Sequence, residues 1–407
     1  MTPTTPTTPT TAPSGAPPAP WPRVLGYAAF LACSWTWCIG MYLPVILARD
    51  LGPWSFLVFA LPNCLGAAAM GVLLWRPASS TRLLAHHAPA ARVFSLVTLA
   101  FQVWFLGALL SFASVDRVVL LLGALGGLGA GLLAAGRRPS PRLLASGVMW
   151  AASIALVGLW LARREPAPLP PTPDGAWVGL LALLPVCAFG FALCPYLDLT
   201  FHAARQSLPG RPGTHAFLLG FLVLFPAMIL LTAAYAPSLI GAAALNPARA
   251  LPPLVAAHIA AQLVFTGVLH VRSADDGSPR ARPIAFITPA LALALGLAGA
   301  ILPADRLYAG LTPFEVIYCT FMGFYGLAAP AYVLLCVLGP GCIRPAPDRR
   351  TLAVLAGAIV LATPLFWVGF LDREMLYAAA GVAVILMAKA FVRPTPPGAP
   401  ARPARST

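Results

Sequence analysis

Residues 24–48 read VLGYAAFLACSWTWCIGMYLPVILA, and residues 176–203 read AWVGLLALLPVCAFGFALCPYLDLTFHA. Both stretches are long and apolar enough to cross a membrane as helices, which takes about 20 residues. Each contains a proline, Pro44 or Pro195, that cannot donate a hydrogen bond to the carbonyl four residues earlier. Backbone groups freed at membrane depth need a partner from protein, water or ligand. The two stretches therefore predict interrupted transmembrane helices, near Gly40–Pro44 and near Gly190–Pro195.

Ten further apolar stretches of similar length follow the same pattern, which predicts an all-α polytopic membrane protein. The expected twelve spans are 24–48, 53–75, 92–113, 118–135, 143–162, 176–204, 214–236, 251–271, 283–302, 311–338, 351–371 and 375–392. No loop between them is long enough to hold a separate domain, so residues 23–392 are expected to form one transmembrane transporter domain. The Thr/Pro-rich residues 1–22 and the tail 393–407 are expected to be disordered and cytoplasmic.

Arginines alternate in density along the loops, and this alternation predicts the orientation in the membrane. Most of the 26 basic residues fall in every second segment. With the amino terminus in the cytoplasm, the outer loops keep only Arg49, Arg117, Arg163, Arg164, Arg249, Arg306 and Arg373. The opposite orientation would place the basic majority outside, against the positive-inside bias. We therefore expect an integral protein of the cytoplasmic (inner) membrane with both termini inside.

The composition restricts the kinds of partner that the chain is expected to bind. It is 59% hydrophobic and 9% charged, outside the usual range of soluble domains. A net charge of +14 would suit nucleic acid, but the arginines lie at helix ends instead of on one helix face. Membrane lipid is therefore the expected partner, and nucleic acid is not. The eight cysteines show neither a disulfide framework nor the spacing of a zinc site, so no metal centre is expected.

A stripe of small residues marks the fourth span, which reads VVLLLGALGGLGAGLLAA over residues 118–135. Gly123, Gly127 and Gly131 recur every four residues and so share one face of a helix. Such a stripe lets two helix backbones approach closely. We expect this contact to be ordinary packing within the chain and not a dimer interface.

The two interrupted spans, the first and the sixth, hold corresponding positions in two sets of five helices. These sets are residues 24–162 and 176–338, and residues 351–392 would add two C-terminal helices. Interrupted helices at equivalent places of an inverted repeat indicate a transport site. The candidate substrate-cavity residues lie near the two interruptions and in the third span: Trp37, Gly40, Tyr42, Pro44, Gln102, Gly190, Phe191 and Tyr196.

Asp198 is the ionisable residue that lies most clearly within a span. An ionisable side chain inside the membrane is energetically costly, so its presence indicates a functional or structural role. His202 and Arg205 follow at i+4 and i+7, so all three share one helix face if the helix is regular. In one interpretation Asp198 binds a cation or a proton beside the cavity, and His202 modulates it. In the other, Asp198 pairs with His202 and Arg205 and only anchors the helix end. Thr266, in the eighth span, could complete a sodium site with carbonyls of the first span.

A second charged pair is expected at the outer ends of two spans. Arg49 ends the first span, and Glu315 lies about one turn into the tenth, on the same side of the membrane. An ion pair between them would form an outer gate. The alternative is that Glu315 lies at the interface and extends to water.

The chain resembles the amino acid–polyamine–organocation superfamily of secondary transporters, which includes the sodium:solute symporters. The resemblance rests on twelve spans, both ends inside, and interruptions near CIGMYLP in the first span and ALCPYLD in the sixth. It implies a 5+5 inverted repeat, a small organic solute bound between the broken helices, and sodium between the first and eighth helices. By this resemblance Gly40, Phe191 and Thr266 are the positions to test. No cofactor is implied beyond sodium or protons as coupling ions.

Other function classes fit the sequence less well. A major-facilitator transporter also has twelve helices, but the loop WRPASSTRLLAHHAPAAR at residues 75–92 lacks that family's Gly/Asp/Arg signature. An intramembrane enzyme would need clustered acid–base or nucleophilic groups. His202 beside Asp198 is the only such pair in the spans, so we do not expect an enzyme. A non-transporting sensor or scaffold is the remaining alternative.

Overall fold

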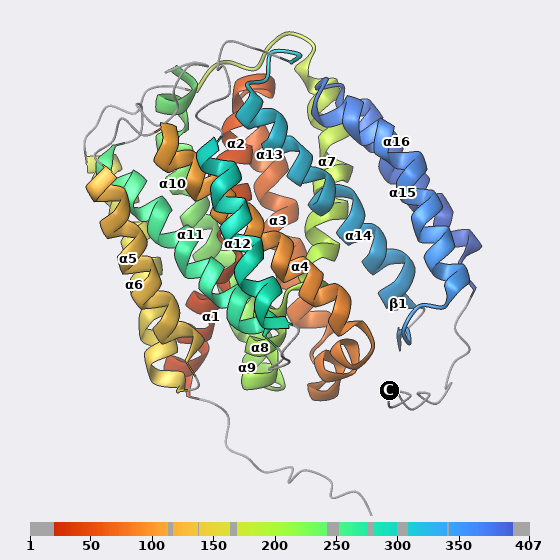
Figure 1. Cartoon of the computed structure of the whole chain (residues 1–407), viewed down its shortest axis with the longest axis horizontal. Coiled ribbons are helices and arrows are strands. Elements are labelled where there is room, and N and C mark those ends of the chain that lie inside the picture. The colour runs from red at the N-terminus through yellow and green to blue at the C-terminus, as the bar shows by residue number, and fades with distance from the viewer. Residues whose placement is uncertain are drawn as a thin grey trace, which may run out of the picture.

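The computed structural model describes residues 20–112, 117–136, 138–162, 169–241, 252–275, 281–298, 308–339 and 342–393. Within these residues the chain is a bundle of helices (Figure 1), apart from a short antiparallel hairpin of β1 Leu338–Gly339 and β2 Cys342–Ile343. The expected all-α membrane fold is therefore confirmed in its class. The terminal segments expected to be disordered lie almost wholly outside the described residues.

The helices follow the apolar stretches of the sequence. In chain order they are α1 Trp21–Trp35, α2 Cys38–Leu51, α3 Ser55–Leu73, α4 Pro77–Phe112, α5 Arg117–Ala135, α6 Pro139–Ala162, α7 Ala176–Leu193, η1 Cys194–Leu197, α8 Leu199–Ser207, α9 Arg211–Leu219, η2 Gly220–Leu224, α10 Phe225–Gly241, α11 Pro253–Ala274, α12 Ala281–Ala298, α13 Pro313–Gly323, η5 Phe324–Ala328, α14 Ala329–Tyr332, η6 Val333–Val337, α15 Arg349–Phe370, α16 Met375–Ala388 and η7 Lys389–Phe391. η1 and η7 are 3-10 turns, whereas η2, η5 and η6 are π-helical segments inside longer helices.

The number of membrane-crossing helices is smaller than the twelve expected from the sequence. Among the described residues, nine helices are long and apolar enough to cross a membrane. A tenth is obtained if α1 and α2, which meet at an angle of 58°, form one broken span. This set leaves out α12 and the shorter apolar helix at Met375–Phe391. A polytopic membrane protein is supported, and the exact count of twelve stays a prediction.

The segment 76–91 is not the polar loop that the sequence suggested. It forms the first turns of α4, a helix of 36 residues. The reason is a stripe of buried side chains at helical spacing, Ser80, Leu83, His87 and Ala91, each fully covered by the rest of the protein. Polar residues on the other face had hidden this periodicity.

Glycines set the closest helix contacts. A Cβ atom at Gly123 would lie 2.2 Å from the carbonyl oxygen of Ala257, and one at Gly127 would lie 2.1 Å from that of Ala261. The stripe on α5 therefore packs against α11 of the same chain, as expected. Only glycine allows this backbone contact.

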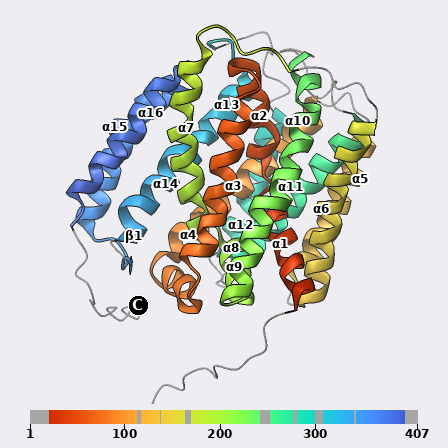
Figure 2. The ribbon, with the colours of Figure 1, turned by 180° about the vertical axis from the view of Figure 1, so that it is seen from behind.

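Two types of helix–helix contact each occur twice in the bundle. α5 packs along α11, and α4 packs along α12 in the same manner. α3 packs against α7, where a Cβ atom at Gly66 would meet the carbonyl of Phe191 at 2.3 Å. Likewise α1 packs against α9 and η2, where a Cβ atom at Gly220 would meet the carbonyl of Ala28 at 2.9 Å. The first and second groups of five helices are thus interleaved and not side by side (Figures 1 and 2).

The two ends of the bundle differ in charge. α1 and α9 begin at one end, and α5 and α11 finish there. We call it the Arg-rich end because Arg23, Arg142, Arg205, Arg211 and Arg272 lie on the helix segments that reach it. α2 finishes and α13 begins at the opposite end, which we call the Glu315 end (Figure 1). Between them, the outward faces carry exposed leucines such as Leu181 and Leu361, as expected for surfaces that contact lipid.

Candidate functional site

The first helix is interrupted at Thr36 and Trp37, four residues before the predicted place. α1 ends at Trp35 and α2 begins at Cys38, and Thr36 has an extended backbone with φ −80° and ψ 90°. Pro44 lies inside α2 instead of ending a helix. The carbonyl of Gly40, which Pro44 leaves free, accepts a hydrogen bond from Thr232 Oγ1 at 2.9 Å. The expected break at Gly40–Pro44 is therefore wrong, because a neighbouring helix satisfies the freed carbonyl.

Side chains satisfy the carbonyls at the break itself. The indole nitrogen of Trp37 donates to the carbonyl of Ser34 at 2.6 Å, and Thr36 Oγ1 donates to that of Ala32 at 2.8 Å. Tyr318 donates to the carbonyl of Cys38 at 2.9 Å. The break is consequently held by specific side-chain hydrogen bonds and is not a frayed helix end.

The second interruption lies in the sixth apolar stretch. α7 stays regular through Gly190 to Leu193, and the chain then passes through the 3-10 turn η1 to Asp198, whose extended backbone caps α8. Only the Pro195 end of the predicted range lies in this break. Cys194 Sγ donates to the carbonyl of Tyr325 at 3.2 Å, which ties the break to the π-helical segment η5.

A cavity of about 20 Å³ lies between the two breaks. It is lined by Trp35, Trp37, Ile39, Gly40, Asn63, Gly190, Phe191, Cys194 and Tyr325. Of the predicted cavity residues, Trp37, Gly40, Gly190 and Phe191 are in this lining, whereas Tyr42, Pro44, Gln102 and Tyr196 are not. The volume holds about one water molecule. The central cavity is therefore closed in this conformation.

Asn63 and Tyr325 are the polar lining residues that the sequence interpretation did not place in the cavity. Asn63 Oδ1 accepts a hydrogen bond from the indole nitrogen of Trp35 at 2.6 Å. Tyr325 donates to Thr98 Oγ1 at 3.0 Å. The signal for Asn63 was its position after Pro62 within an apolar span. Tyr325 gave no such signal, because aromatic residues are common throughout the tenth span.

Two further cavities lie between the centre and the Glu315 end. The first, of about 50 Å³, shares Ile39, Gly190, Phe191 and Tyr325 with the central cavity. The second, of about 520 Å³, shares Leu43, Leu47 and Phe370 with the first and is also lined by Arg49, Asp50 and Arg373. The three cavities form a row that widens toward this end.

Tilted aromatic rings pack against one another next to Trp35 and Trp37 of the cavity lining. The ring centroids of Trp35 and Trp37 lie 4.4 Å apart, and those of Trp35 and Phe201 lie 5.0 Å apart. Phe201 belongs to α8 and contacts Phe221 of η2 at the same 5.0 Å. These rings separate the cavity from the Arg-rich end.

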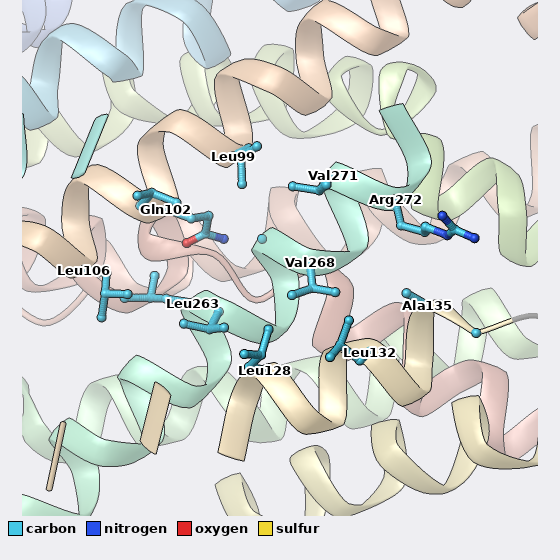
Figure 3. A pocket seen from close by; sticks show the side chains of 14 residues that line it. Leu99, Gln102, Leu106, Leu128, Leu132, Ala135, Leu263, Val268, Val271 and Arg272 are labelled. Atoms are coloured by element: carbon cyan, nitrogen blue, oxygen red, sulfur yellow. The ribbon is translucent and has the colours of Figure 1, made fainter. Parts of the chain in front are cut away.

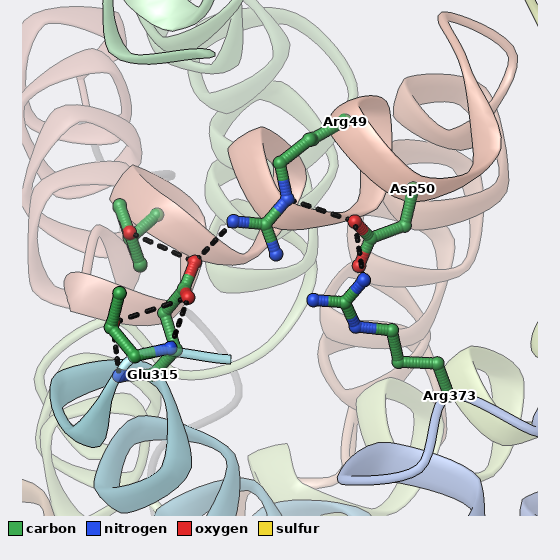
Figure 4. Close-up of polar contacts among 6 residues, drawn as sticks. Arg49, Asp50, Glu315 and Arg373 are labelled. Carbon is green, nitrogen blue, oxygen red and sulfur yellow. Dashed lines mark hydrogen bonds and ion pairs between the residues drawn. The ribbon is translucent and has the colours of Figure 1, made fainter. Parts of the chain in front are cut away.

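Arg49 and Glu315 are brought together as expected (Figure 4). Arg49 Nη1 lies 2.5 Å from Glu315 Oε1, and its Nε lies 2.8 Å from Asp50 Oδ1. Arg373 lies 3.5 Å from the same Asp50 oxygen. Glu315 Oε2 also accepts from the backbone nitrogen of Thr312 at 2.9 Å, which closes a capping box at the start of α13.

Glu315 is 2% exposed, so the alternative in which it extends to water is wrong. Tyr42 contributes here and not in the central cavity, because its hydroxyl lies 3.5 Å from Glu315 Oε1. The four charged groups form an alternating network across α2, α13 and the turn between α15 and α16.

Asp198 does not pair with His202 or Arg205 through its side chain. Its Oδ1 accepts from the backbone nitrogen and the hydroxyl of Thr200, both at 2.7 Å. Its Oδ2 is buried and has no hydrogen-bond partner among the described residues. One carboxylate oxygen therefore caps α8, and the other is left for a proton or a cation.

His202 and Arg205 have structural partners from other helices. His202 lies 2.8 Å from Ser80 Oγ through Nδ1 and 2.9 Å from the carbonyl of Tyr196 through Nε2. Because a carbonyl only accepts, Nε2 carries the hydrogen and Nδ1 accepts from Ser80. Arg205 donates to the carbonyls of Leu74, Trp75 and Gly210 and so holds the end of α3. The expected anchoring trio is wrong because each member binds elsewhere.

Thr266 lies next to the first break, but the side-chain amide of Gln262 already binds a carbonyl there. Its Oγ1 lies 3.4 Å from the carbonyls of both Cys33 and Thr36. Gln262 Nε2 donates to the carbonyl of Cys33 at 2.6 Å. A sodium ion would need these oxygens as ligands, and the amide NH₂ would first have to leave. Among the described residues, no group of three or more His, Cys, Asp or Glu side chains is placed to hold a metal ion.

Comparison with known families gives no match: no family model fits the chain, and no curated protein resembles it.

Proposed function

We propose that this protein is a secondary active transporter that moves a small organic solute across the cytoplasmic membrane. The observation that carries the proposal is the pair of helix breaks, at Thr36–Trp37 and at Cys194–Asp198, which face one closed cavity. In transporters, breaks of this kind place helix ends and backbone groups beside a solute site at the middle of the bilayer.

The recurring helix pairs support a 5+5 inverted repeat. Numbering the spans from the amino terminus, α3 against α7 is the second span on the sixth, and α9 against α1 is the seventh on the first. In the same way α5 against α11 is the fourth on the eighth, and α12 against α4 is the ninth on the third. Adding five to each span number, and subtracting ten from any result above ten, converts the second–sixth contact into the seventh–first contact. The same operation converts the fourth–eighth contact into the ninth–third contact. This relation favours the proposed repeat over a major-facilitator arrangement of six and six helices.

The cavities suggest how access would alternate. The row from the Glu315 end is the route from one side, and the Arg49–Glu315 pair is its gate. The packed rings of Trp35, Trp37 and Phe201 would close the other side. Movement of α1 and α8 relative to the rest of the bundle would open that side while the gate stays shut. The positive-inside bias assigns the Arg-rich end to the cytoplasm.

The lining of the central cavity indicates the class of solute. It has aromatic and aliphatic side chains, the amide of Asn63, and no charged side chain among the described residues. A small neutral molecule with a hydrogen-bonding group suits this lining. Because the cavity now holds about one water molecule, solute binding requires it to widen.

For coupling we propose protonation of Asp198 instead of sodium at Thr266. Asp198 Oδ2 is buried without a partner in the described part of the chain, so gain or loss of a proton there would break no existing hydrogen bond. The sodium position is less favoured because Gln262 occupies the carbonyl of Cys33. An enzymatic role is also less favoured, since His202 is held by Ser80 and Tyr196.

The test is solute counterflow with purified protein in liposomes. Neutral amino acids, nucleobases and polyols are first screened for a rise in the unfolding temperature of the detergent-solubilised protein. A solute that stabilises the protein is then loaded inside liposomes, and uptake of its radiolabelled form is followed. The proposal predicts transient accumulation above the level of empty liposomes. If no solute of these three classes binds or exchanges, the transporter proposal fails.

A further inference from the structure

A second large cavity lies outside the proposed transport route. It has a volume of about 590 Å³ and runs along α11 between α4 and α5 (Figure 3). Its walls are aliphatic, with Leu99 and Leu106 from α4, Leu128 and Leu132 from α5, and Val268 from α11. A volume of this size accommodates a drug-sized molecule. We call it the lateral groove.

The lateral groove is accessible from the bilayer. Leu128 and Leu132 of its α5 wall are 40% and 59% exposed on the outward surface of the bundle. An apolar surface that faces hydrocarbon is reached by molecules dissolved in the membrane and not by those dissolved in water. Its occupant is therefore expected to be lipid-soluble.

One polar group points into this apolar groove, the amide of Gln102. Gln102 is 1% exposed, and its Oε1 accepts from the backbone nitrogen of Cys38 at 3.3 Å. That contact fixes the orientation of the amide, because a backbone N–H can only donate. The NH₂ group is directed toward the groove (Figure 3), and its Nε2 is buried and has no hydrogen-bond partner among the described residues.

A buried donor without an acceptor is costly, so the groove is suited to a ligand that brings an oxygen to this depth. No charged side chain of the described chain lies at the Gln102 end; Arg272 lies at the Arg-rich end of the groove. The two observations define the ligand by its chemistry: a neutral polar head with an acceptor, and an apolar body and tail.

We propose that the lateral groove binds a neutral, membrane-dissolved amphiphile whose carbonyl oxygen accepts a hydrogen bond from Gln102 Nε2. Its hydrocarbon tail lies along Leu132 and Val268 toward the bilayer. The site is separate from the central cavity, although Gln102 connects it to Cys38, the first residue of α2. The proposal does not rest on transport.

The test uses two ligands that differ only in the carbonyl, decanophenone and decylbenzene. Each competes with photolabelling of the protein in nanodiscs by 4-decylbenzophenone, and labelled peptides are mapped by mass spectrometry. The site predicts labels on groove residues of α4, α5 and α11. Loss of one hydrogen bond should make decylbenzene about fivefold weaker as a competitor than decanophenone.

Three substitutions locate the binding. Gln102→Leu should remove the difference between the two competitors. Gly267→Leu fills the groove, since a Cβ atom there would lie 3.5 Å from Leu99 Cδ1, and labelling should be lost. Gly129→Leu is the matched control, because its Cβ atom would meet nothing within 4 Å. It should leave labelling unchanged.

Two results would overturn the proposal. Equal competition by both ligands, with no effect of Gln102→Leu, would make the groove an unspecific hydrocarbon surface. Loss of labelling in Arg272→Gln, with competition by phosphatidylglycerol, would assign the groove to an anionic phospholipid. Because only binding is measured, either result leaves the transport proposal untouched.

Discussion

Two arginines of this protein bind backbone carbonyls at helix ends. Arg205 is 2% exposed and reaches the carbonyls of Leu74 and Trp75, which end α3, and of Gly210. Arg142 does the same for α5, donating to the carbonyls of Ala134 and Gly136. These two arginines at the Arg-rich end thus cap helices.

Replacement of Arg205 by methionine should destabilise the protein by about 2–4 kcal/mol, because three carbonyls lose their donor in a buried place. The measurement is the free energy of unfolding in detergent. The control is Arg350→Met, at an exposed residue near the start of α15. Equal stability of the two variants would show that Arg205 is not a structural cap.

Asp198 tests the coupling proposal at the level of a single atom. In Asp198→Asn the amide oxygen can still cap α8 through Thr200, but the second position no longer binds a proton. We expect exchange of solute between the two sides of the membrane to continue and uphill uptake driven by a proton gradient to be lost. Uphill uptake at the wild-type rate in Asp198→Asn would make the residue a helix cap and nothing more.

At the scale of whole elements, backbone contact between α5 and α11 is set by glycine. A methyl group at Gly127 would lie 2.1 Å from the carbonyl oxygen of Ala261, so the two helices would have to separate. Gly127→Ala should therefore cost about 1–3 kcal/mol of unfolding free energy.

The neighbouring Gly126 provides the control for this prediction, since a Cβ atom there would meet nothing within 4 Å. Gly126→Ala should be neutral or stabilising by up to about 1 kcal/mol, because alanine is the better helix former. The difference between these two alanine variants, measured by thermal unfolding, isolates the contact. If they behaved alike, α5 and α11 would not be packed through this face.

The sequence predicted the elements better than it predicted where they break. Apolar stretches of membrane length were sufficient to place the helices, and the charges of Arg49 and Glu315 were sufficient to suggest their pairing. The break at Thr36–Trp37 was not predictable from Pro44, because the carbonyl of Gly40 is satisfied by Thr232, which is 192 residues away in the chain. Likewise, no local pattern could show that His202 binds Ser80 and not Asp198. The local sequence shows which backbone hydrogen bonds a proline removes. The side chains that bind the freed groups instead come from distant parts of the chain and are set by the tertiary fold.

At the scale of the whole molecule, the account rests on one closed cavity between two broken helices. Gly40 lines this cavity, and a Cβ atom at Gly40 would meet nothing within 4 Å, so the first atom of a side chain can be added there without a clash. Gly357 offers the same freedom on the exposed face of α15, far from the breaks in sequence and outside the cavity lining. The two glycines therefore allow the same substitution to be made inside and outside the proposed site.

The most direct measurement is counterflow by Gly40→Val and Gly357→Val in liposomes, with the solute that stabilises the wild-type protein. We expect Gly40→Val to exchange solute at least about tenfold more slowly than the wild type, because valine takes up the space that the solute needs. Gly357→Val should match the wild type. Exchange at the wild-type rate by folded Gly40→Val would contradict a transport site between the two breaks.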